Sequence, residues 1–251
     1  MLMKKVAAFL VDAADFDGTN DVMTRGAGLT GAADSKIGTL VFWFRADGND
    51  ASVSKIISGL ATVGSATARG VFVSRDATPN IIKIQARNAA TALILDLTTT
   101  SSFATSATWF CCMSSWDLVD TAKRHLYIGD SSEINVNTYT NDTIDYTVAD
   151  WSVGAFGDVT QPFSGCFAEF WFAPGQYIDF SAEANRRLFF SASGKPVSLG
   201  TDGSTPTGTA PLVFFHLDNG EAVANFATNR GSGGNFTITG TLDTASTSPS
   251  D

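Results

Sequence analysis

The sequence predicts an all-β fold, a two-sheet antiparallel jelly-roll sandwich with one short helix. Short apolar segments recur roughly every ten residues with turn signals between them, which is typical of a sandwich. The chain is 44% hydrophobic and contains 19 Phe and 5 Trp, so it can fill a large core. Only 16% of its residues are charged, and small residues fill the intervals between apolar segments as turns require.

The densest aromatic segment spans residues 162–174, with the sequence PFSGCFAEFWFAP. We interpret it as a central strand. Side chains alternate between the two faces of a strand. We therefore expect Phe167, Glu169 and Trp171 on one face. The opposite face should carry Ala168, Phe170 and Phe172. Both sets are largely apolar, so we expect this strand to be covered on both sides.

The other apolar segments supply the remaining strands. In chain order we expect them at residues 6–11, 22–24, 39–46, 55–60, 70–74, 81–87, 92–98, 108–116, 124–129, 151–154, 212–217 and 235–242. Segment 39–46 (TLVFWFRA) places Leu40, Phe42 and Phe44 on one face. Segment 81–87 alternates apolar and polar residues, which indicates a sheet with one solvated face.

One helix is predicted over residues 182–191. Ser181 can cap its free N–H groups, and Glu183 suits its positive N-terminal end. Gly194 can close the helix, and Pro196 prevents its continuation.

Composition favours a single domain over residues 1–251, with a core at residues 6–242 and a polar tail at residues 243–251. The net charge of −9 is concentrated in the second half: the first 125 residues carry 12 basic and 11 acidic side chains, and the rest carry 4 and 14. No basic cluster could neutralise a run of phosphates, so we expect no nucleic-acid partner. No segment has the length and apolarity of a membrane span, so we expect no membrane insertion.

The three cysteines, Cys111, Cys112 and Cys166, are expected to be buried free thiols. Cys111 and Cys112 are adjacent on a predicted strand and should face opposite sides, which prevents them from pairing. Free thiols in apolar surroundings favour folding in a reducing cytoplasm.

Three segments together resemble a known family. They are the opening FDGTND at residues 16–21 followed by residues 39–46, RHLYIGD at residues 124–130, and residues 162–173 followed by a short helix after Asp179. In order and spacing they are similar to the laminin G-like (LamG-like) members of the concanavalin A-like lectin and glucanase fold. The resemblance implies two curved antiparallel sheets, surface loops around a concave face, and N- and C-terminal strands lying side by side.

Residues 194–211 and the later run GSGGNFT at residues 231–237 resemble LamG-type proteins encoded among tailed-phage virion genes. This resemblance implies a structural protein of a phage particle, such as a capsid decoration, spike or tail-fibre component. Such a protein would fold in the host cytoplasm, lie on the virion surface, contact other virion proteins and form a homo-oligomer.

No catalytic residues are predicted. A retaining glycosidase needs two carboxylates about 5 Å apart, and the neighbours of Glu169 on its expected face are Phe167 and Trp171. Because burying an unpaired charge is costly, we expect Glu169 to pair with an arginine or to accept backbone N–H groups. Contact with a ligand on the concave face is the alternative. His125 and His216 are interpreted as structural.

Calcium is the candidate cofactor, since related proteins hold it through Asp and Asn oxygens. One candidate set is Asp47, Asn49 and Asp50, which directly follow the strand at residues 39–46. The other is Asp15, Asp17, Asn20 and Asp21. Ordinary turn formation would produce the same residues, so both interpretations stay open.

Glycan binding generally needs an aromatic platform beside hydrogen-bonding side chains on loops. The candidate ligand-binding residues are Trp116, Asp117 and Asp120 at a strand end, and Asp158 and Gln161 in the loop before the central strand.

Three functions are therefore weighed. The first is a non-catalytic phage virion protein used for recognition of, or adhesion to, host-surface polysaccharide. The second is a stand-alone carbohydrate-binding module, and the third is a glycan-degrading enzyme. The single carboxylate on the central strand argues against the third, and the sequence favours the first.

Overall fold

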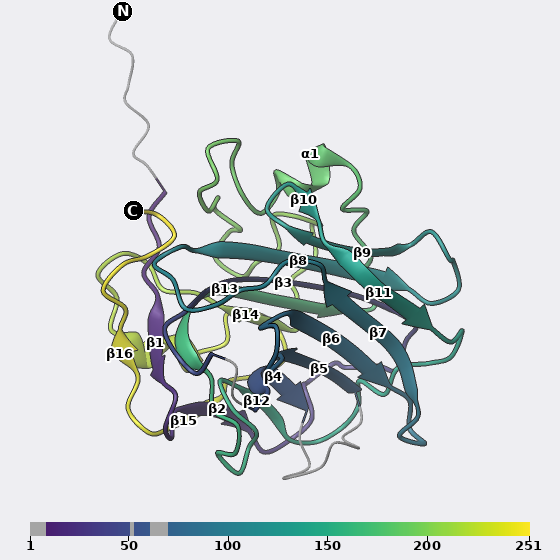
Figure 1. The fold of residues 1–251 in the computed structure, drawn as a ribbon, viewed down its shortest axis with the longest axis horizontal. Helices are drawn as coiled ribbons and strands as arrows, with labels where there is room; N and C mark the ends of the chain where they lie inside the picture. The colour runs from purple at the N-terminus through teal and green to yellow at the C-terminus, as the bar shows by residue number, and fades with distance from the viewer. Residues whose placement is uncertain (1–8, 51–52, 61–69) are drawn as a thin grey trace, which may run out of the picture.

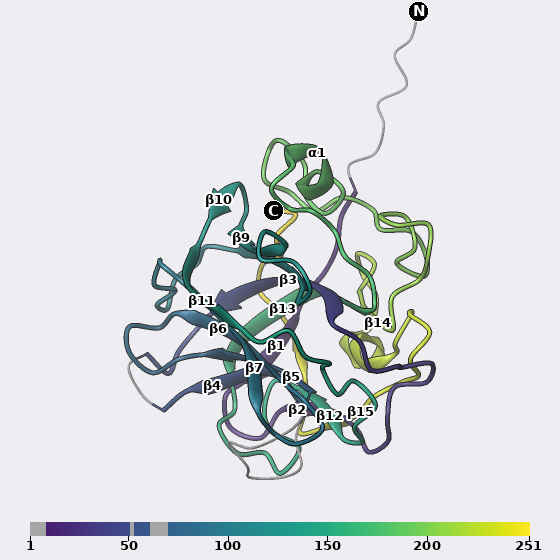
Figure 2. The same ribbon diagram turned by 90° about the vertical axis from the view of Figure 1, so that its right-hand side faces the viewer.

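The computed structural model describes residues 9–50, 53–60 and 70–251. Two antiparallel sheets pack face to face, as Figures 1 and 2 show, which confirms the predicted jelly-roll sandwich. Sheet I has the order β10-β9-β8-β3-β13-β1-β16, with β14 also paired to β13. Its strands are β10 (Ser131–Ser132), β9 (Arg124–Ile128), β8 (Phe110–Asp117), β3 (Ile37–Ala46), β13 (Ser164–Pro174), β1 (Ala14–Asp17), β16 (Asp243–Thr244) and β14 (Val213–Phe215).

Sheet II has the order β11-β7-β6-β5-β4-β12-β2-β15. Its strands are β11 (Ile134–Tyr139), β7 (Leu93–Thr99), β6 (Ile82–Arg87), β5 (Gly70–Arg75), β4 (Lys55–Leu60), β12 (Trp151–Val153), β2 (Val22–Arg25) and β15 (Thr237–Thr239). Two short helices complete the described elements: α1 (Glu183–Arg186) and the 3₁₀ helix η1 (Val223–Ala227). The described residues include no helix long and apolar enough to cross a membrane.

The two faces of sheet I are buried in different ways. Leu40, Phe42 and Phe44 of β3 point into the main core between the sheets, as their alternation predicts. Val41 and Trp43 point outward into a second apolar cluster. The connection between β13 and β14 crosses that outer face (Figure 2). Its side chains, such as Phe189, belong to the outer cluster that covers the face.

Sheet II has a solvated outer face. Ile82, Ile84 and Ala86 of β6 are buried, while the residues between them are half-buried. This alternation was predicted, and it leaves sheet II as the sheet whose outer surface can meet a ligand.

A β-bulge in β13 overturns the predicted pairing of its side chains. Ala168 lies opposite Trp43 and Trp171 lies opposite Val41, so two residues, Glu169 and Phe170, share the interval facing one residue of β3. Glu169 has a φ of 51°. The extra residue reverses the alternation beyond it: Phe167, Phe170 and Phe172 face the main core, while Ala168 and Trp171 face outward. The prediction that the strand is covered on both sides is confirmed.

Several predicted boundaries also change. The helix is confined to Glu183–Arg186; its N-cap is Ala182, without a side-chain cap, because the Ser181 hydroxyl instead donates to Asp179. The opening strand is Ala14–Asp17, and of the predicted segment 6–11 the first three residues lie outside the described ranges. The expected polar tail is partly ordered into the sheet, because β16 pairs with β1. This pairing places the first and last strands side by side, as the family resemblance implies.

The three cysteines are free and buried, as predicted. Cys112 lies in the main core and Cys111 lies in the outer cluster, so the adjacent thiols face opposite sides of sheet I.

Candidate functional site

Trp116 is not an exposed platform, contrary to the prediction. Its side chain is 0% exposed and belongs to the main core. The indole Nε1 donates to the Tyr146 hydroxyl at 2.9 Å, and that hydroxyl donates to the Ile37 carbonyl at 3.0 Å. Gly38 permits this packing, since a Cβ there would lie 2.7 Å from Trp116 Cζ2. The position at a strand end suggested exposure, but residues 144–146 cover it.

Asp117 and Asp120 gather around Lys123 on the loop after β8. Lys123 Nζ lies 3.4 Å from the carboxylate of Asp117 and 3.9 Å from that of Asp120. The same ammonium group lies 5.5 Å from the ring centre of Tyr177, a residue that sequence reasoning missed. The charged groups of this cluster therefore satisfy one another.

The hydroxyl of Tyr177 continues the same cluster. It lies 2.7 Å from His125 Nε2, which is itself 3.3 Å from Asp179 Oδ1. Burial, reinforced by Asp179, Asp120 and Asp117, raises the pKa of Tyr177 to about 12. The phenol therefore stays protonated at neutral pH, and the cluster stabilises the loop in this form.

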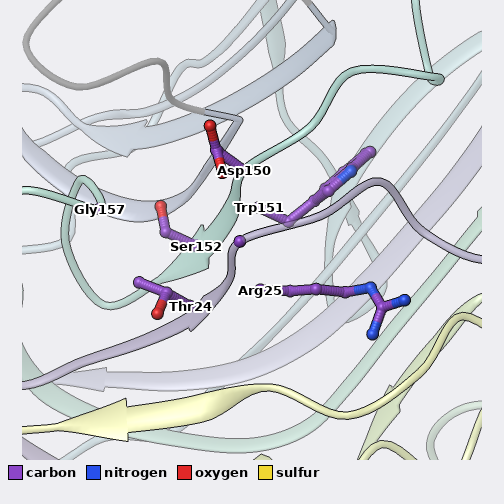
Figure 3. A pocket seen from close by; sticks show the side chains of 7 residues that line it. Thr24, Arg25, Asp150, Trp151, Ser152 and Gly157 are labelled. Carbon is purple, nitrogen blue, oxygen red and sulfur yellow. The ribbon is translucent and has the colours of Figure 1, made fainter.

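A hollow of about 220 Å³ opens on the outer face of sheet II, where β2 and β12 lie side by side (Figure 3). It is lined by Thr24, Arg25, Gly26, Asp150, Trp151, Ser152 and Gly157. The side chains of Thr24, Ser152 and Asp150 lie on the side of Gly157, whereas those of Arg25 and Trp151 extend the other way. The hollow thus presents two hydroxyl groups and one carboxylate.

The polar groups of the hollow differ in how they are used. Ser152 Oγ donates to the Gly59 carbonyl at 3.2 Å. Arg25 is turned away and donates to Gly28, Thr30 and Asn235. Asp150 is exposed, and its carboxylate has no hydrogen-bond partner within the described part of the chain. Asp150 is therefore the group in the hollow that is available to an incoming donor.

The hollow continues a row of outward-facing residues that crosses sheet II. The first half of the row crosses β15, β2, β12 and β4, where strand pairing aligns Thr237, Thr24, Ser152 and Gly59. The second half crosses β5, β6, β7 and β11, where strand pairing aligns Phe72, Gln85, Asp96 and Thr138. We call these eight residues the polar row.

Phe156 lies over the middle of the polar row. Its ring stacks on Phe72 with centroids 5.6 Å apart, and a Cβ on Gly59 would lie 3.7 Å from its Cδ1. Beyond it, Asp96 Oδ1 is shielded from solvent and has no hydrogen-bond partner among the described residues. Carboxylate oxygens without donors are costly when buried, so this oxygen is an unsatisfied acceptor beneath the row.

Asp158 and Gln161 belong to the loop that walls the hollow, but neither lines it. Asp158 Oδ1 accepts from the backbone N–H and the hydroxyl of Thr160, and these bonds hold the pKa of Asp158 below its usual value. The backbone carbonyl of Gln161 accepts from Ile56. The loop that contains both residues walls the hollow, and the residue it contributes to the lining is Gly157.

Two arginines hold the proposed calcium ligands. Arg45 donates to both carboxylate oxygens of Asp47 at 2.7 Å, and Arg75 Nη1 donates to Asp50 at 2.7 Å. Asp50 also accepts from the Thr105 backbone. Charge balance is therefore supplied by guanidinium groups, and calcium at Asp47, Asn49 and Asp50 stays a prediction without structural support.

The second acidic set forms turns. Asp17 Oδ1 accepts from Thr19 and Asn20, and Asp21 accepts from Asp17 and Thr241. Asp15, Asp47 and Cys166 do bring ligand atoms within 4.8 Å of one another in the described structure. Arg45 Nη2 already lies 3.3 Å from the Cys166 sulfur, and calcium prefers oxygen ligands. This group is therefore no calcium site.

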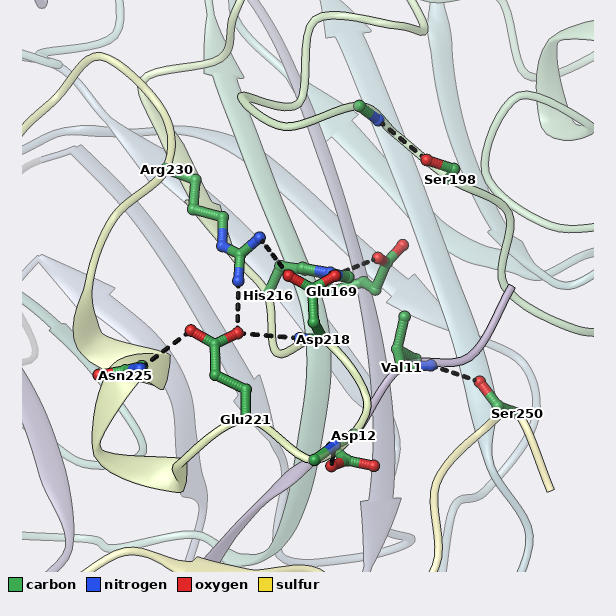
Figure 4. Close-up of polar contacts among 12 residues, drawn as sticks. Val11, Asp12, Glu169, Ser198, His216, Asp218, Glu221, Asn225, Arg230 and Ser250 are labelled. Atoms are coloured by element: carbon green, nitrogen blue, oxygen red, sulfur yellow. Dashed lines mark hydrogen bonds and ion pairs between the residues drawn. The ribbon is translucent and has the colours of Figure 1, made fainter. Parts of the chain in front are cut away.

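Glu169 pairs with a histidine rather than an arginine. Its Oε1 lies 2.7 Å from His216 Nδ1, while His216 Nε2 lies 3.1 Å from Asp218 (Figure 4). Arg230 joins Asp218 to Glu221. Glu169 is 2% exposed, so it cannot reach a glycan. His216, interpreted from sequence as structural, links a buried carboxylate to a chain of surface charges.

Comparison with solved structures finds similar sandwiches in other proteins. A candidate carbohydrate-binding protein from Bacteroides ovatus superposes with a TM-score of 0.64 at 13% identity, covering 95% of this chain and 61% of that one. A heptameric SAP-like pentraxin from Limulus polyphemus superposes with a TM-score of 0.49 at 11% identity, covering 68% of this chain and 78% of that one. Domains LG4-5 of mouse laminin alpha1 give 0.43 at 15% identity, covering 68% and 43%.

The likeness to the Bacteroides ovatus protein establishes the fold, and at this identity the fold alone. The chain spans 61% of the length of that neighbour. No protein-family model matches the chain, and no curated protein matches it by sequence.

Replacing Trp116 with Ala is expected to lower the free energy of unfolding by about 3–5 kcal/mol, because it empties a fully buried site. Binding of any ligand should be unchanged in the fraction that stays folded. Urea denaturation measures the first effect, and Val119→Ala, at an exposed neighbour, is the matched control. A Trp116→Ala protein as stable as the control would show that the indole lies at the surface.

Proposed function

We propose that this chain is a non-catalytic carbohydrate-binding protein whose ligand lies on the solvated face of sheet II. The observation that carries the proposal is the hollow beside β2 and β12, with Thr24, Ser152 and Asp150 facing the same space. The carbohydrate-binding role assigned to the Bacteroides ovatus neighbour supports the same function.

The chemistry of the hollow suits a sugar. Sugar hydroxyls both donate and accept hydrogen bonds, and Asp150 offers an acceptor while Thr24 offers a group of either kind. A volume of about 220 Å³ lies just under the roughly 300 Å³ at which pockets for drug-sized ligands begin. We therefore assign the hollow to one sugar unit. A longer chain would continue along the polar row past Phe156 toward Phe72 and Gln85.

The absence of catalysis is part of the proposal. Hydrolysis with retention needs two carboxyl groups about 5 Å apart on either side of the bond. Asp150 is the one carboxylate among the residues that line the hollow, and Glu169 is buried in β13 of sheet I. These placements favour binding without cleavage.

The direct test is a glycan array probed with the purified chain and with two leucine variants. Gly157→Leu adds an apolar side chain inside the hollow without backbone strain, since a Cβ there meets only Thr24 at 4.0 Å. We expect it to weaken binding at least about tenfold, the loss of roughly 1.4 kcal/mol. Ala192→Leu adds the same side chain to an exposed turn and should bind normally.

Two outcomes would contradict the proposal in different ways. Equal binding by Gly157→Leu and Ala192→Leu would move the ligand away from the hollow. Failure of the unmodified chain to bind any bacterial polysaccharide, on the array or on whole cells, would reject carbohydrate binding itself.

We further propose that the protein serves on a phage particle, where the bound glycan is host-surface polysaccharide. The support is the resemblance of residues 194–211 and 231–237 to LamG-type virion proteins. In this role the chain forms a homo-oligomer that contacts other virion proteins, because appendages follow the symmetry of the particle.

This role predicts two measurements. Light scattering on the purified chain should give a defined oligomer, and mass spectrometry of phage particles purified from lysates of the encoding bacterium should detect the protein. A monomer that is missing from those particles would leave a stand-alone carbohydrate-binding module as the better description.

A further inference from the structure

Residues 9–13, which we call the N-terminal strap, cross the outer side of sheet I next to the segment after β14. Asp12 donates its backbone N–H to the Leu217 carbonyl at 3.1 Å, and its carboxylate accepts from Gly220 at 2.7 Å. Val11 forms a bridge with Asp218 and donates to the Ser250 hydroxyl at 2.9 Å. Figure 4 shows the strap beside the chain of charges that begins at Glu169.

The strap also contacts the buried histidine. The ring of Phe9 stacks on His216 with centroids 5.9 Å apart and an interplanar angle of 12°. Phe214 stacks on His216 as well, at 5.5 Å and 24°. A cation stacked on aromatic faces is attracted by them, so a charged imidazole strengthens the contact that the strap makes through Phe9.

The two nitrogens of His216 both face carboxylate oxygens, Nδ1 toward Glu169 and Nε2 toward Asp218. A neutral imidazole has only one N–H and can satisfy only one of them. When both carboxylates are ionised, the imidazole must carry a second proton in order to donate to both of them. This second proton is shared between His216 and Glu169. The second oxygen of Glu169 has no partner among the described residues, so His216 provides the compensation for this buried charge.

Other charged and titratable groups surround the pair on several elements. Arg230 binds Asp218 from the segment after η1 and is itself bound by Glu221. Cys111 of β8 faces Glu169 from within sheet I; burial, followed by Cys112 and Glu169, raises the pKa of its thiol, which therefore stays neutral. The strap contributes Asp12, whose carboxylate is held by the Gly220 backbone.

Loss of the shared proton would therefore act on the strap. It would leave Glu169 as a buried anion without a cationic partner, which is costly. It would also remove the positive charge against which Phe9 and Phe214 stack, and it would leave Nε2 without an N–H for Asp218, the residue that bridges Val11. We propose that the Glu169–His216 pair is a pH-sensitive latch that fastens the N-terminal strap to sheet I and releases it as pH rises.

The titration of both groups supports this direction. Burial lowers the pKa of His216, but the hydrogen bonds with Glu169 and Asp218 outweigh burial and place the pKa above its ordinary value of 6.5. Burial raises the pKa of Glu169, and His216 offsets only part of that. Both groups thus hold their proton more tightly in the closed state, so the stabilisation is full below about pH 6.5 and is lost as pH rises through the raised pKa.

Hydrogen exchange measured by NMR on the full chain tests the latch. Between about pH 6.5 and the raised pKa of His216, opening releases one proton, so the opening equilibrium should rise by up to about tenfold per pH unit. After correction for base-catalysed exchange, the Asp12 and Gly220 amides should lose protection across this range. The amide of Met113 in β8 should lose much less, because the strap opens without the core.

Two variants separate the latch from general pH effects. The double variant Glu169→Gln/His216→Gln removes both titrating groups of the latch, so the pH dependence at Asp12 and Gly220 should disappear. His125→Gln removes the other histidine of the chain and should leave that dependence unchanged. If the double variant fails to fold, the pH dependence of the strap amides relative to the Met113 amide in the unmodified chain still tests the latch.

Three results would overturn the inference. One is strap protection in the unmodified chain that does not vary with pH after correction. Another is an equal loss of exchange protection at the Met113 amide, which would indicate global unfolding. The third is a pH dependence that survives in the double variant Glu169→Gln/His216→Gln or disappears in His125→Gln.

Discussion

The structure depends on the way β13 is buried between two apolar layers. A regular strand there would send Glu169 and Trp171 to the same side, and it would leave the carboxylate among aromatic rings. The bulge at Glu169 changes the alternation within one step: Phe170 and Phe172 enter the main core, and Trp171 joins the outer cluster. The bulge lies where the neighbour of β13 changes from β1 to β14, so the extra residue meets His216 just beyond the end of β14.

This burial also decides which surface can serve a ligand. The outer face of sheet I is occupied by the β13–β14 connection, the strap and the ordered tail, so it is a second core. Sheet II keeps its outer face toward solvent, and its outward residues are small or polar at the strands β2 and β12. The carbohydrate-binding proposal therefore rests on sheet II, and the latch rests on sheet I.

The sequence predicted the sandwich because alternation is a local property. In β3 and β6 it assigned the correct residues to each face. It failed in β13, because a bulge is set by the neighbouring strands and leaves no mark in the apolar pattern. Trp116 was misplaced for a similar reason: Tyr146, which covers it, is distant in the chain. The hollow was missed because its groups, Thr24, Ser152 and Asp150, have no spacing of their own, although the nearby loop was identified through Asp158 and Gln161. His216 could have been suspected as the partner of Glu169, since the chain has two histidines and a protonated imidazole can compensate a buried carboxylate.

Mapping of backbone amide shifts by NMR, while the chain is titrated with the strongest glycan from an array, would locate the bound sugar on the protein. We expect the shifts to centre on Thr24, Ser152 and Gly157 and to extend along the polar row toward Phe72. Shifts that centre on Lys123, His125 and Tyr177, with none on sheet II, would contradict this expectation and would assign binding to the loop after β8.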